Sequence, residues 1–183
     1  MDLSFVMHRA PILIGDYQFH DSLKKEVLSL LESSYFISKD NTNVKATRTD
    51  WNWNPDNIKI RNLKSYIREE IERVFAPGKI FGKRMHLVPH NFWANIYEKG
   101  DYAQPHDHKP NDFSFSYFVK SKWYHSPLVF GHSGRRIRPK EGTYVIFPSY
   151  LVHHVPKNRY NNTRVTLSGN FIVDSSKLLE GVV

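Results

Sequence analysis

The sequence predicts a mainly β protein in which a jelly roll is braced by two N-terminal helices. Apolar residues recur at helical spacing in two segments of the first half, residues 21–34 and 58–75. The second half instead contains short segments rich in Val, Ile, Phe and Tyr, at 85–98, 113–119, 127–130, 143–147, 151–155 and 163–173. Many short strands at this spacing are typical of a β-sandwich or barrel, and helices that precede the strands disfavour a βαβ sheet.

The composition of the chain limits both its architecture and its chemistry. With 183 residues, 40% of them hydrophobic, we expect one domain over 1–183, with helical support and loop in 1–84 and a β core in 85–175. The absence of cysteine excludes disulfides, Cys-ligated zinc, iron–sulfur clusters and thiol nucleophiles. Because no long apolar run and no basic start followed by an apolar stretch occur, we expect a cytoplasmic protein without membrane contact.

The first predicted elements are a short strand and a helix. The apolar run Pro11 to Ile14 is compatible with a strand. Asp21 or Ser22 can cap the helix that follows, and this helix is expected to end near Ser34. Its side chains Leu23, Val27, Leu30 and Leu31 recur at the spacing of one helix face.

A polar segment, residues 38–57, separates this helix from the second one and is expected to be a long loop. Trp51 and Trp53 lie within it. Large aromatic residues in a polar loop either clamp the loop onto the core or belong to a binding surface, and we favour the clamp. The second helix is predicted over 58–75, where one apolar stripe runs along a charged segment.

Ten histidines in a chain without cysteine raise the question of a metal site. His106 and His108 are two residues apart, and in an extended chain they would project to the same side, where both could reach one ion. A pair of this kind also occurs as an ordinary surface pair. A third candidate, His153, shares a strand face with Leu151 and Val155 and is expected to point inward, whereas His154 faces outward or towards a loop. The alternative for His153 is a core histidine bonded to a carbonyl group.

The strand at 163–173 is expected to have two unlike faces. Period two places Arg164, Thr166 and Ser168 on one face, and Val165 and Leu167 on the other. A polar face within a β-rich domain is explained if it lines a pocket, where Arg offers a fork for a carboxylate and a hydroxyl can bind the same group. The alternative is the outer face of an edge strand.

The order of these segments resembles the superfamily of iron(II)- and 2-oxoglutarate-dependent oxygenases, and more narrowly a small-domain branch that is often phage-encoded. The resemblance covers roughly residues 85–173 and rests on five segments, Trp93-Ala94-Asn95-Ile96-Tyr97, Gly100-Asp101-Tyr102, His106-Asp107-His108, Phe147-Pro148-Ser149-Tyr150-Leu151-Val152-His153 and Arg164-Val165-Thr166. It implies a double-stranded β-helix with a metal at one mouth. It also implies hydroxylation of an unidentified substrate with O2 and 2-oxoglutarate as co-substrates.

The resemblance implies a role for each candidate residue. His106 and His153 would be iron(II) ligands, and His108 would be the third, at a position where most of the superfamily carries Asp or Glu. Arg164 would pair with the distal carboxylate of 2-oxoglutarate, assisted by Thr166 or Ser168. Two tyrosines occupy positions from which pocket hydroxyls often contact the co-substrate, Tyr97 and Tyr117, and the alternative for both is an ordinary place in the aromatic core.

The substrate remains open at the level of sequence. By family analogy we favour a protein or peptide side chain over a nucleic acid. A nucleic-acid substrate for the same chemistry, as in demethylases, would use the basic loop 134–140 together with the basic residues of the second helix, Lys59, Arg61, Lys64 and Arg68. Two non-catalytic alternatives are a cupin-like module that binds metal or sugar, and a structural phage-type protein with a degenerate site.

Overall fold

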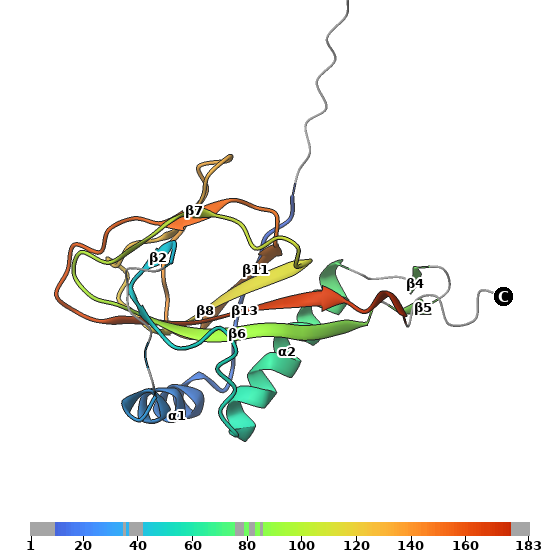
Figure 1. Ribbon diagram of the computed structural model, residues 1–183, viewed down its shortest axis with the longest axis horizontal. Coiled ribbons are helices and arrows are strands. Elements are labelled where there is room, and N and C mark those ends of the chain that lie inside the picture. The colour runs from blue at the N-terminus through green and yellow to red at the C-terminus, as the bar shows by residue number, and fades with distance from the viewer. Residues whose placement is uncertain are drawn as a thin grey trace, which may run out of the picture.

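The computed structural model describes residues 10–34, 36, 42–75, 79–80, 83–84 and 86–176, and two antiparallel sheets facing each other form its centre (Figure 1). The larger sheet has the order β1 (Leu13–Asp16), β11 (Thr143–Pro148), β8 (Phe113–Lys120), β13 (Arg164–Val173), β6 (Leu87–Tyr97), β3 (Thr47–Arg48). The smaller sheet has the order β10 (Arg136–Ile137), β9 (Leu128–Phe130), β12 (His153–Val155), β7 (Tyr102–His106), β2 (Val44–Lys45). A separate two-stranded sheet pairs β4 (Lys79–Ile80) with β5 (Lys83–Arg84). The predicted jelly roll, a double-stranded β-helix, is confirmed.

Two helices, α1 (His20–Glu32) and α2 (Ile58–Phe75), lie against the outer face of the larger sheet (Figure 1). Both bury one stripe at helical spacing, made of Leu23, Val27 and Leu31 in α1 and of Ile60, Leu63, Ile67 and Ile71 in α2. The bounds of α2 agree with the prediction. Because neither stripe could be buried by a lone helix in water, the packing against the sheet is what stabilises both helices.

The larger sheet separates two apolar cores by the alternation of its side chains. On β13, Val165 and Leu167 face the helices and belong to the outer core, between sheet and helices. The inner core lies between the two sheets and includes Phe118, Val145 and Phe147. The same alternation directs the polar positions of β13 inward, towards the space that the two sheets enclose.

The two tryptophans of the polar segment clamp it onto the sheet, as expected. The Trp53 ring stacks on Phe92 with centroids 5.9 Å apart, and Trp51 meets Trp93 edge to face at 4.5 Å. The Arg48 guanidinium lies 3.9 Å from the centroid of the Trp51 ring. These contacts tie the segment between α1 and α2 to β6.

Several predictions about the first half are wrong in detail. The helix α1 begins at His20 with Phe19 as its N-cap, and no side chain caps it, so neither Asp21 nor Ser22 has that role. The segment 38–57 is not only a loop, because its described part contains β2 and β3, which pair with β7 and β6. Strands of two residues are too short to show alternation, and their partners are far away in the sequence.

The division into a supporting part and a β core is also less sharp than expected. The strands β1, β2 and β3 all come from the first part and complete the edges of the two sheets. In the second part, β7 and β10 were not predicted, and β10 lies inside the basic loop 134–140.

Within the part of the chain that the structure describes, no helix is both long enough and apolar enough to cross a membrane.

Candidate metal centre and co-substrate pocket

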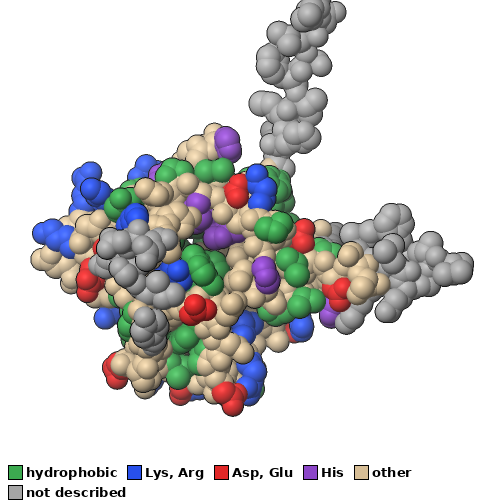
Figure 2. Space-filling model, viewed as in Figure 1, with side chains coloured by type: hydrophobic (Ala, Val, Ile, Leu, Met, Phe, Trp, Pro, Cys, Tyr) green, Lys and Arg blue, Asp and Glu red, His purple; other side chains and the backbone are tan. Residues whose placement is uncertain are grey.

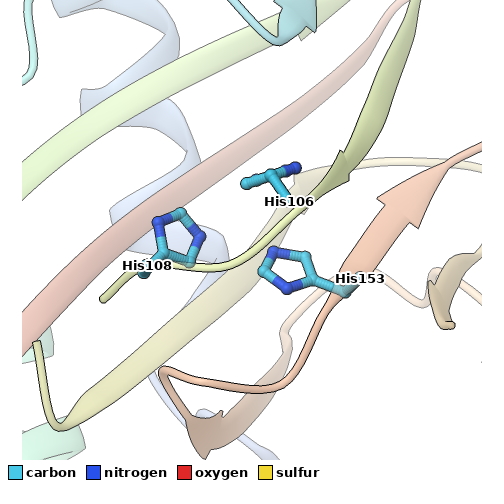
Figure 3. A group of neighbouring side chains, drawn as sticks. All are labelled: His106, His108 and His153. Atoms are coloured by element: carbon cyan, nitrogen blue, oxygen red, sulfur yellow. The ribbon is translucent and has the colours of Figure 1, made fainter. Parts of the chain in front are cut away.

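Three imidazole rings converge at one end of the space between the sheets (Figure 3). His106 is the last residue of β7, His108 follows in the next loop, and His153 opens the neighbouring strand β12, where it pairs with His106. One nitrogen from each ring lies within 4.8 Å of the others. Ring centroids are 4.5 Å apart for His106 and His153, and 5.0 Å apart for each of the other two pairs.

Backbone carbonyl groups orient two of the three rings. The Nδ1 atom of His106 lies 2.6 Å from the carbonyl oxygen of Gln104, and that of His153 lies 2.8 Å from the carbonyl oxygen of Leu151. Because a carbonyl oxygen only accepts, Nδ1 carries the proton in both rings, which leaves Nε2 with its lone pair free for a ligand bond. Backbone bonds of this kind typically support metal-binding histidines.

His108 lies in the cluster together with His106, as the two-residue spacing predicted. It follows the last residue of β7, His106, and so lies just outside the paired strand. The backbone of His108 is fixed from both sides: its N–H donates to the carbonyl oxygen of Ser149 at 2.8 Å, and its carbonyl accepts from Asn111 at 2.7 and 3.0 Å. Its ring rests against Trp93, with centroids 5.7 Å apart.

Burial keeps the imidazoles neutral. It lowers the pKa of His108 to about 3, with repulsion from His153 and His106 as the next causes, and it lowers the pKa of His153 to about 3 for similar reasons. It also lowers the pKa of His106. Since only the neutral ring can bind a metal, all three groups are in the competent form at neutral pH.

No carboxylate of the described residues joins this cluster. Asp107 instead forms an ion pair with Lys109 at 3.1 Å, and a carboxylate oxygen of Asp112 accepts the backbone N–H of Val173 at 2.7 Å. The donor set is therefore three neutral nitrogens, which suits Fe(II), Zn(II), Cu(II) and Ni(II). The residues present thus fit a divalent ion of this group.

The same pocket contains a buried cation, Arg164. This side chain is 2% exposed, and its Nε and Nη1 atoms have no hydrogen-bond partner within the described residues. Its guanidinium lies 4.9 Å from the Tyr97 ring centroid and 5.3 Å from that of Phe118. Burial lowers the pKa of Arg164. An unpaired buried guanidinium is costly, so this group fits an anionic ligand that forms a bidentate contact.

Polar side chains line the same pocket beside the guanidinium. The amide nitrogen of Asn95 is 3.4 Å from the Thr166 hydroxyl and 3.5 Å from the Ser168 hydroxyl, and the Asn95 carbonyl oxygen has no partner among described groups. The predicted inward face of β13 is therefore confirmed, with Arg164, Thr166 and Ser168 all in the pocket wall.

The two tyrosines named from the sequence lie on different faces of the larger sheet. Tyr97 lines the pocket, as expected. Tyr117 does not, and its predicted place beside the co-substrate is wrong: it lies in the outer core, with its hydroxyl 2.7 Å from Nδ1 of His20. Its neighbours at two-residue spacing, Phe115 and Val119, belong to the same outer core, and alternation along β8 fixes this side.

Two further pocket residues lie in a segment that carried the resemblance but were given no role from the sequence. Trp93 and Asn95 line the pocket, and the indole N–H of Trp93 is buried without a partner among the described residues. Both share a strand face with Tyr97, so alternation along β6 is the signal that would have found them. A buried indole N–H usually has an acceptor, so Trp93, the Arg164 guanidinium and the Asn95 carbonyl oxygen are three unsatisfied polar groups in residues that line this pocket.

Comparisons with known proteins agree with this geometry. Residues 131–170 match a family described as "Putative 2OG-Fe(II) oxygenase", and no curated protein matches the chain. A viral collagen prolyl hydroxylase from Paramecium Bursaria Chlorella virus-1 is similar in structure, with a TM-score of 0.66 at 12% identity over 87% of this chain and 94% of that one. A Pseudomonas putida prolyl-4-hydroxylase has a TM-score of 0.65 at 14% identity, over 89% and 92%. The α-ketoglutarate-dependent epimerase SnoN from nogalamycin biosynthesis has a TM-score of 0.69 at 11% identity, over 90% and 77%.

The family match covers β12 and most of β13, and so includes His153 and Arg164, whereas the structural likeness extends over most of the chain. The likeness at such low identity concerns the fold. The family match, the double-stranded β-helix and the histidine cluster together support the assignment of this chain to the superfamily of iron(II)- and 2-oxoglutarate-dependent oxygenases.

Proposed function

We propose that this chain is an iron(II)- and 2-oxoglutarate-dependent dioxygenase that hydroxylates a C–H bond of a protein or peptide side chain. The observation that carries the proposal is the content of one pocket: three neutral imidazoles at one end and a buried guanidinium without a partner. A metal site alone would not require the guanidinium, and an anion site alone would not require the imidazoles. Their combination fits a dicarboxylic co-substrate that is held beside a metal.

In this proposal His106, His108 and His153 hold the iron. Arg164 forms a two-pronged contact with the carboxylate of 2-oxoglutarate that lies farther from the metal, with help from the hydroxyls of Thr166 and Ser168. The unpaired indole N–H of Trp93 supplies a further donor near His108. The Tyr97 and Phe118 rings enclose the guanidinium, exclude water from it and thereby strengthen its attraction for the carboxylate.

Bound iron(II) would supply the activation of O2 for oxidative decarboxylation of 2-oxoglutarate. The overall reaction balances as substrate C–H, O2 and 2-oxoglutarate giving substrate C–OH, succinate and carbon dioxide. The part played by the chain is to orient the co-acid and to keep the pocket dry, since buried apolar residues such as Phe147 and Leu128 complete the pocket wall.

A peptide substrate is supported by two observations. Three structural neighbours are a viral collagen prolyl hydroxylase, a prolyl-4-hydroxylase and a prolyl hydroxylase in complex with a peptide fragment. In addition, a largely apolar cavity lies next to the histidine cluster, lined in part by Ile12, Phe130, Leu151 and Val152. Leu151 also accepts the hydrogen bond that orients His153, so a side chain seated there would lie beside the metal end of the pocket.

The decisive experiment is the conversion of 2-oxoglutarate to succinate by the purified protein. We expect turnover that requires both iron(II) and O2 and that increases with a peptide pool as substrate. The matched control is Arg164→Ala, which should lose turnover at low 2-oxoglutarate while still binding metal. Stoichiometric metal binding without any turnover would instead favour the cupin-like binding module, and turnover stimulated only by nucleic acid would favour the demethylase-like alternative.

A further inference from the structure

Another cavity, of about 350 Å³, is bordered by four cationic side chains and two tyrosines. We call it the cationic loop surface, and its defining residues are Arg136, Arg138, Lys157, Arg159, Tyr124 and Tyr160. All four cations are exposed, none of them has an ion-pair partner among the described residues, and no Asp or Glu lines the cavity. The end of the molecule where loops join β6 to β7 and β12 to β13 is rich in Lys and Arg (Figures 1 and 2).

Hydrogen bonds between loops give this surface a fixed shape. The Ser126 hydroxyl donates to the carbonyl oxygen of Lys157 at 3.0 Å and joins the loop before β9 to the loop after β12. Asn158 anchors the second loop, because its N–H donates to the Asp101 carbonyl at 2.8 Å and its carbonyl accepts from Gly100 at 2.7 Å. The Asn162 amide donates to the Tyr124 hydroxyl at 2.5 Å. The cations therefore project from a framework that is ordered before any ligand binds.

Aromatic rings are exposed at the same place. Trp123 is 72% exposed and Tyr160 is 45% exposed. Tyr124 lies between them, with ring centroids 5.8 Å from Trp123 and 4.5 Å from Tyr160. Large exposed aromatic groups that lie side by side are unusual on a surface without a ligand. These rings lie beside cations that have no ion-pair partner among the described residues. Together they match the two requirements of a single nucleic-acid strand: stacking for the bases and positive charge for the phosphates.

We propose that the cationic loop surface binds single-stranded nucleic acid. An acidic peptide would use the four cations, but it would leave the exposed rings of Trp123 and Tyr160 without a planar partner. Double-stranded DNA would present its bases stacked and inaccessible to the rings. A single strand can place phosphates against Arg138 and Arg159 while one or two bases stack on the aromatic residues.

The surface differs from the basic region that the sequence suggested. Of that region, only Arg136 and Arg138 border this cavity. Two of the four helix residues form ion pairs elsewhere: Lys59 pairs with Glu26 at 3.0 Å, and Arg61 pairs with Asp56. The other two cations, Lys157 and Arg159, come from the loop after β12. Their segment contains no run of basic residues in the sequence, so the sequence analysis did not select it.

The surface is also separate from the metal end of the pocket. Pro127 and Pro156 border it, and they flank the start of β9 and the end of β12. His153 instead pairs with Phe130, at the opposite end of both strands. The surface and the histidines therefore lie at opposite ends of β9 and β12, and the inference does not depend on the proposed oxygenase activity.

The test is fluorescence anisotropy of a labelled 15-nucleotide poly(dT) strand with the full chain at about 50 mM salt. We expect binding that weakens steeply with salt, because phosphate contacts release counterions. Arg138→Gln with Arg159→Gln should weaken binding by at least tenfold and reduce the slope of log affinity against log salt by about 1.4, at about 0.7 per lost contact. Trp123→Ala and Tyr160→Ala should each weaken binding about tenfold and leave that slope unchanged.

The matched control is Lys59→Gln with Arg61→Gln, which removes the same charge from α2 and should change affinity by less than twofold. Equal losses in the two charge variants would overturn the proposal, since binding would then follow net charge alone. Absence of binding at 50 mM salt would overturn it as well. Competition by poly-glutamate as effective as that by unlabelled poly(dT), with no effect of Tyr160→Ala, would replace it with an acidic-peptide site.

Discussion

At the scale of single residues, the structure separates two adjacent histidines. His153 faces the pocket, with its Nδ1 bonded to a carbonyl group, whereas His154 lies on the opposite face of β12. His153→Ala should abolish stoichiometric binding of a divalent metal, because two imidazoles remain on a site built for three. His154→Ala should leave stoichiometry unchanged. Titration calorimetry with Fe(II) under anaerobic conditions, or with Ni(II), measures both. The reverse result would place His154 in the site and shift the register of β12 by one residue.

The third imidazole distinguishes this site from one with a carboxylate ligand. His108→Asp should retain metal, since a carboxylate oxygen from the same loop can replace the nitrogen. His108→Ala should bind metal at least tenfold more weakly because the ligand is lost. Both affinities can be measured by competition with a chelating dye. Unchanged affinity in both variants would show that His108 is only a neighbour of the metal.

Arg164 is the residue on which the 2-oxoglutarate assignment depends. A charge-assisted bidentate contact is worth roughly 2–4 kcal/mol, so Arg164→Ala should weaken 2-oxoglutarate binding by about thirtyfold or more. Arg164→Lys should recover only part of the affinity, because an ammonium group cannot match a planar carboxylate at two points. Calorimetry on the metal-loaded protein without O2 measures both effects. Equal 2-oxoglutarate affinity in wild type and Arg164→Ala would exclude the assignment.

At the scale of elements, β13 depends on a glycine at its centre. A Cβ atom at Gly169 would lie 2.7 Å from Cε1 of Phe115 and 2.8 Å from the carbonyl oxygen of Asn91. Both distances are shorter than the non-bonded contacts that Cβ atoms make in proteins. Gly169→Ala should therefore lower the free energy of unfolding by about 1–3 kcal/mol, the cost of overpacking. Urea denaturation monitored by tryptophan fluorescence measures the loss.

Gly131 provides the matched control for this substitution. Its added Cβ would meet nothing closer than 3.6 Å. Gly131→Ala should change the free energy of unfolding by no more than about 0.5 kcal/mol. A similar loss in the two variants would mean that backbone freedom, rather than the close approach of β6 and β8 to β13, decides the result.

At the scale of the whole molecule, the buried histidines couple stability to pH in the metal-free protein. The pKa of His153 is about 3 in the folded chain, against about 6.5 in an unfolded one. Below pH 6.5 the unfolded chain binds the proton and the folded chain does not, so the stability due to this group is complete above pH 6.5. It is lost progressively as pH falls towards 3, by up to about 1.4 kcal/mol per pH unit. His108 contributes a pH dependence of the same sign over the same pH range, because its pKa in the folded chain is also about 3.

Urea midpoints measured between pH 7 and pH 4 test this coupling. The free energy of unfolding should decrease as the pH decreases. The slope of this free energy against pH should be smaller in His153→Gln by up to about 1.4 kcal/mol per pH unit, which is the effect of one bound proton. A slope that is identical in wild type and His153→Gln would mean that the folded protein protonates His153 readily.

The sequence determined those features that depend on local alternation. The apolar stripe of α2 predicted its bounds, and period two along β13 predicted that Arg164, Thr166 and Ser168 share a face. The inward direction of His153 followed from the same alternation. These predictions hold because the direction of a side chain within a helix or strand is set by the backbone of its own element.

The tertiary structure alone decided how distant elements meet. The meeting of His106 and His108 with His153 depends on the pairing of β7 with β12, and a backbone hydrogen bond to Ser149 fixes His108. Alternation places Tyr117 on one face of β8 with Phe115 and Val119, and only the packing of the helices on that face makes it the outer one. The two-residue strands β2 and β3 exist only through their partners. The cationic loop surface likewise combines β10 with the loop after β12. Such juxtapositions depend on pairing between segments far apart in the chain, and alternation within one segment carries no information about its partner.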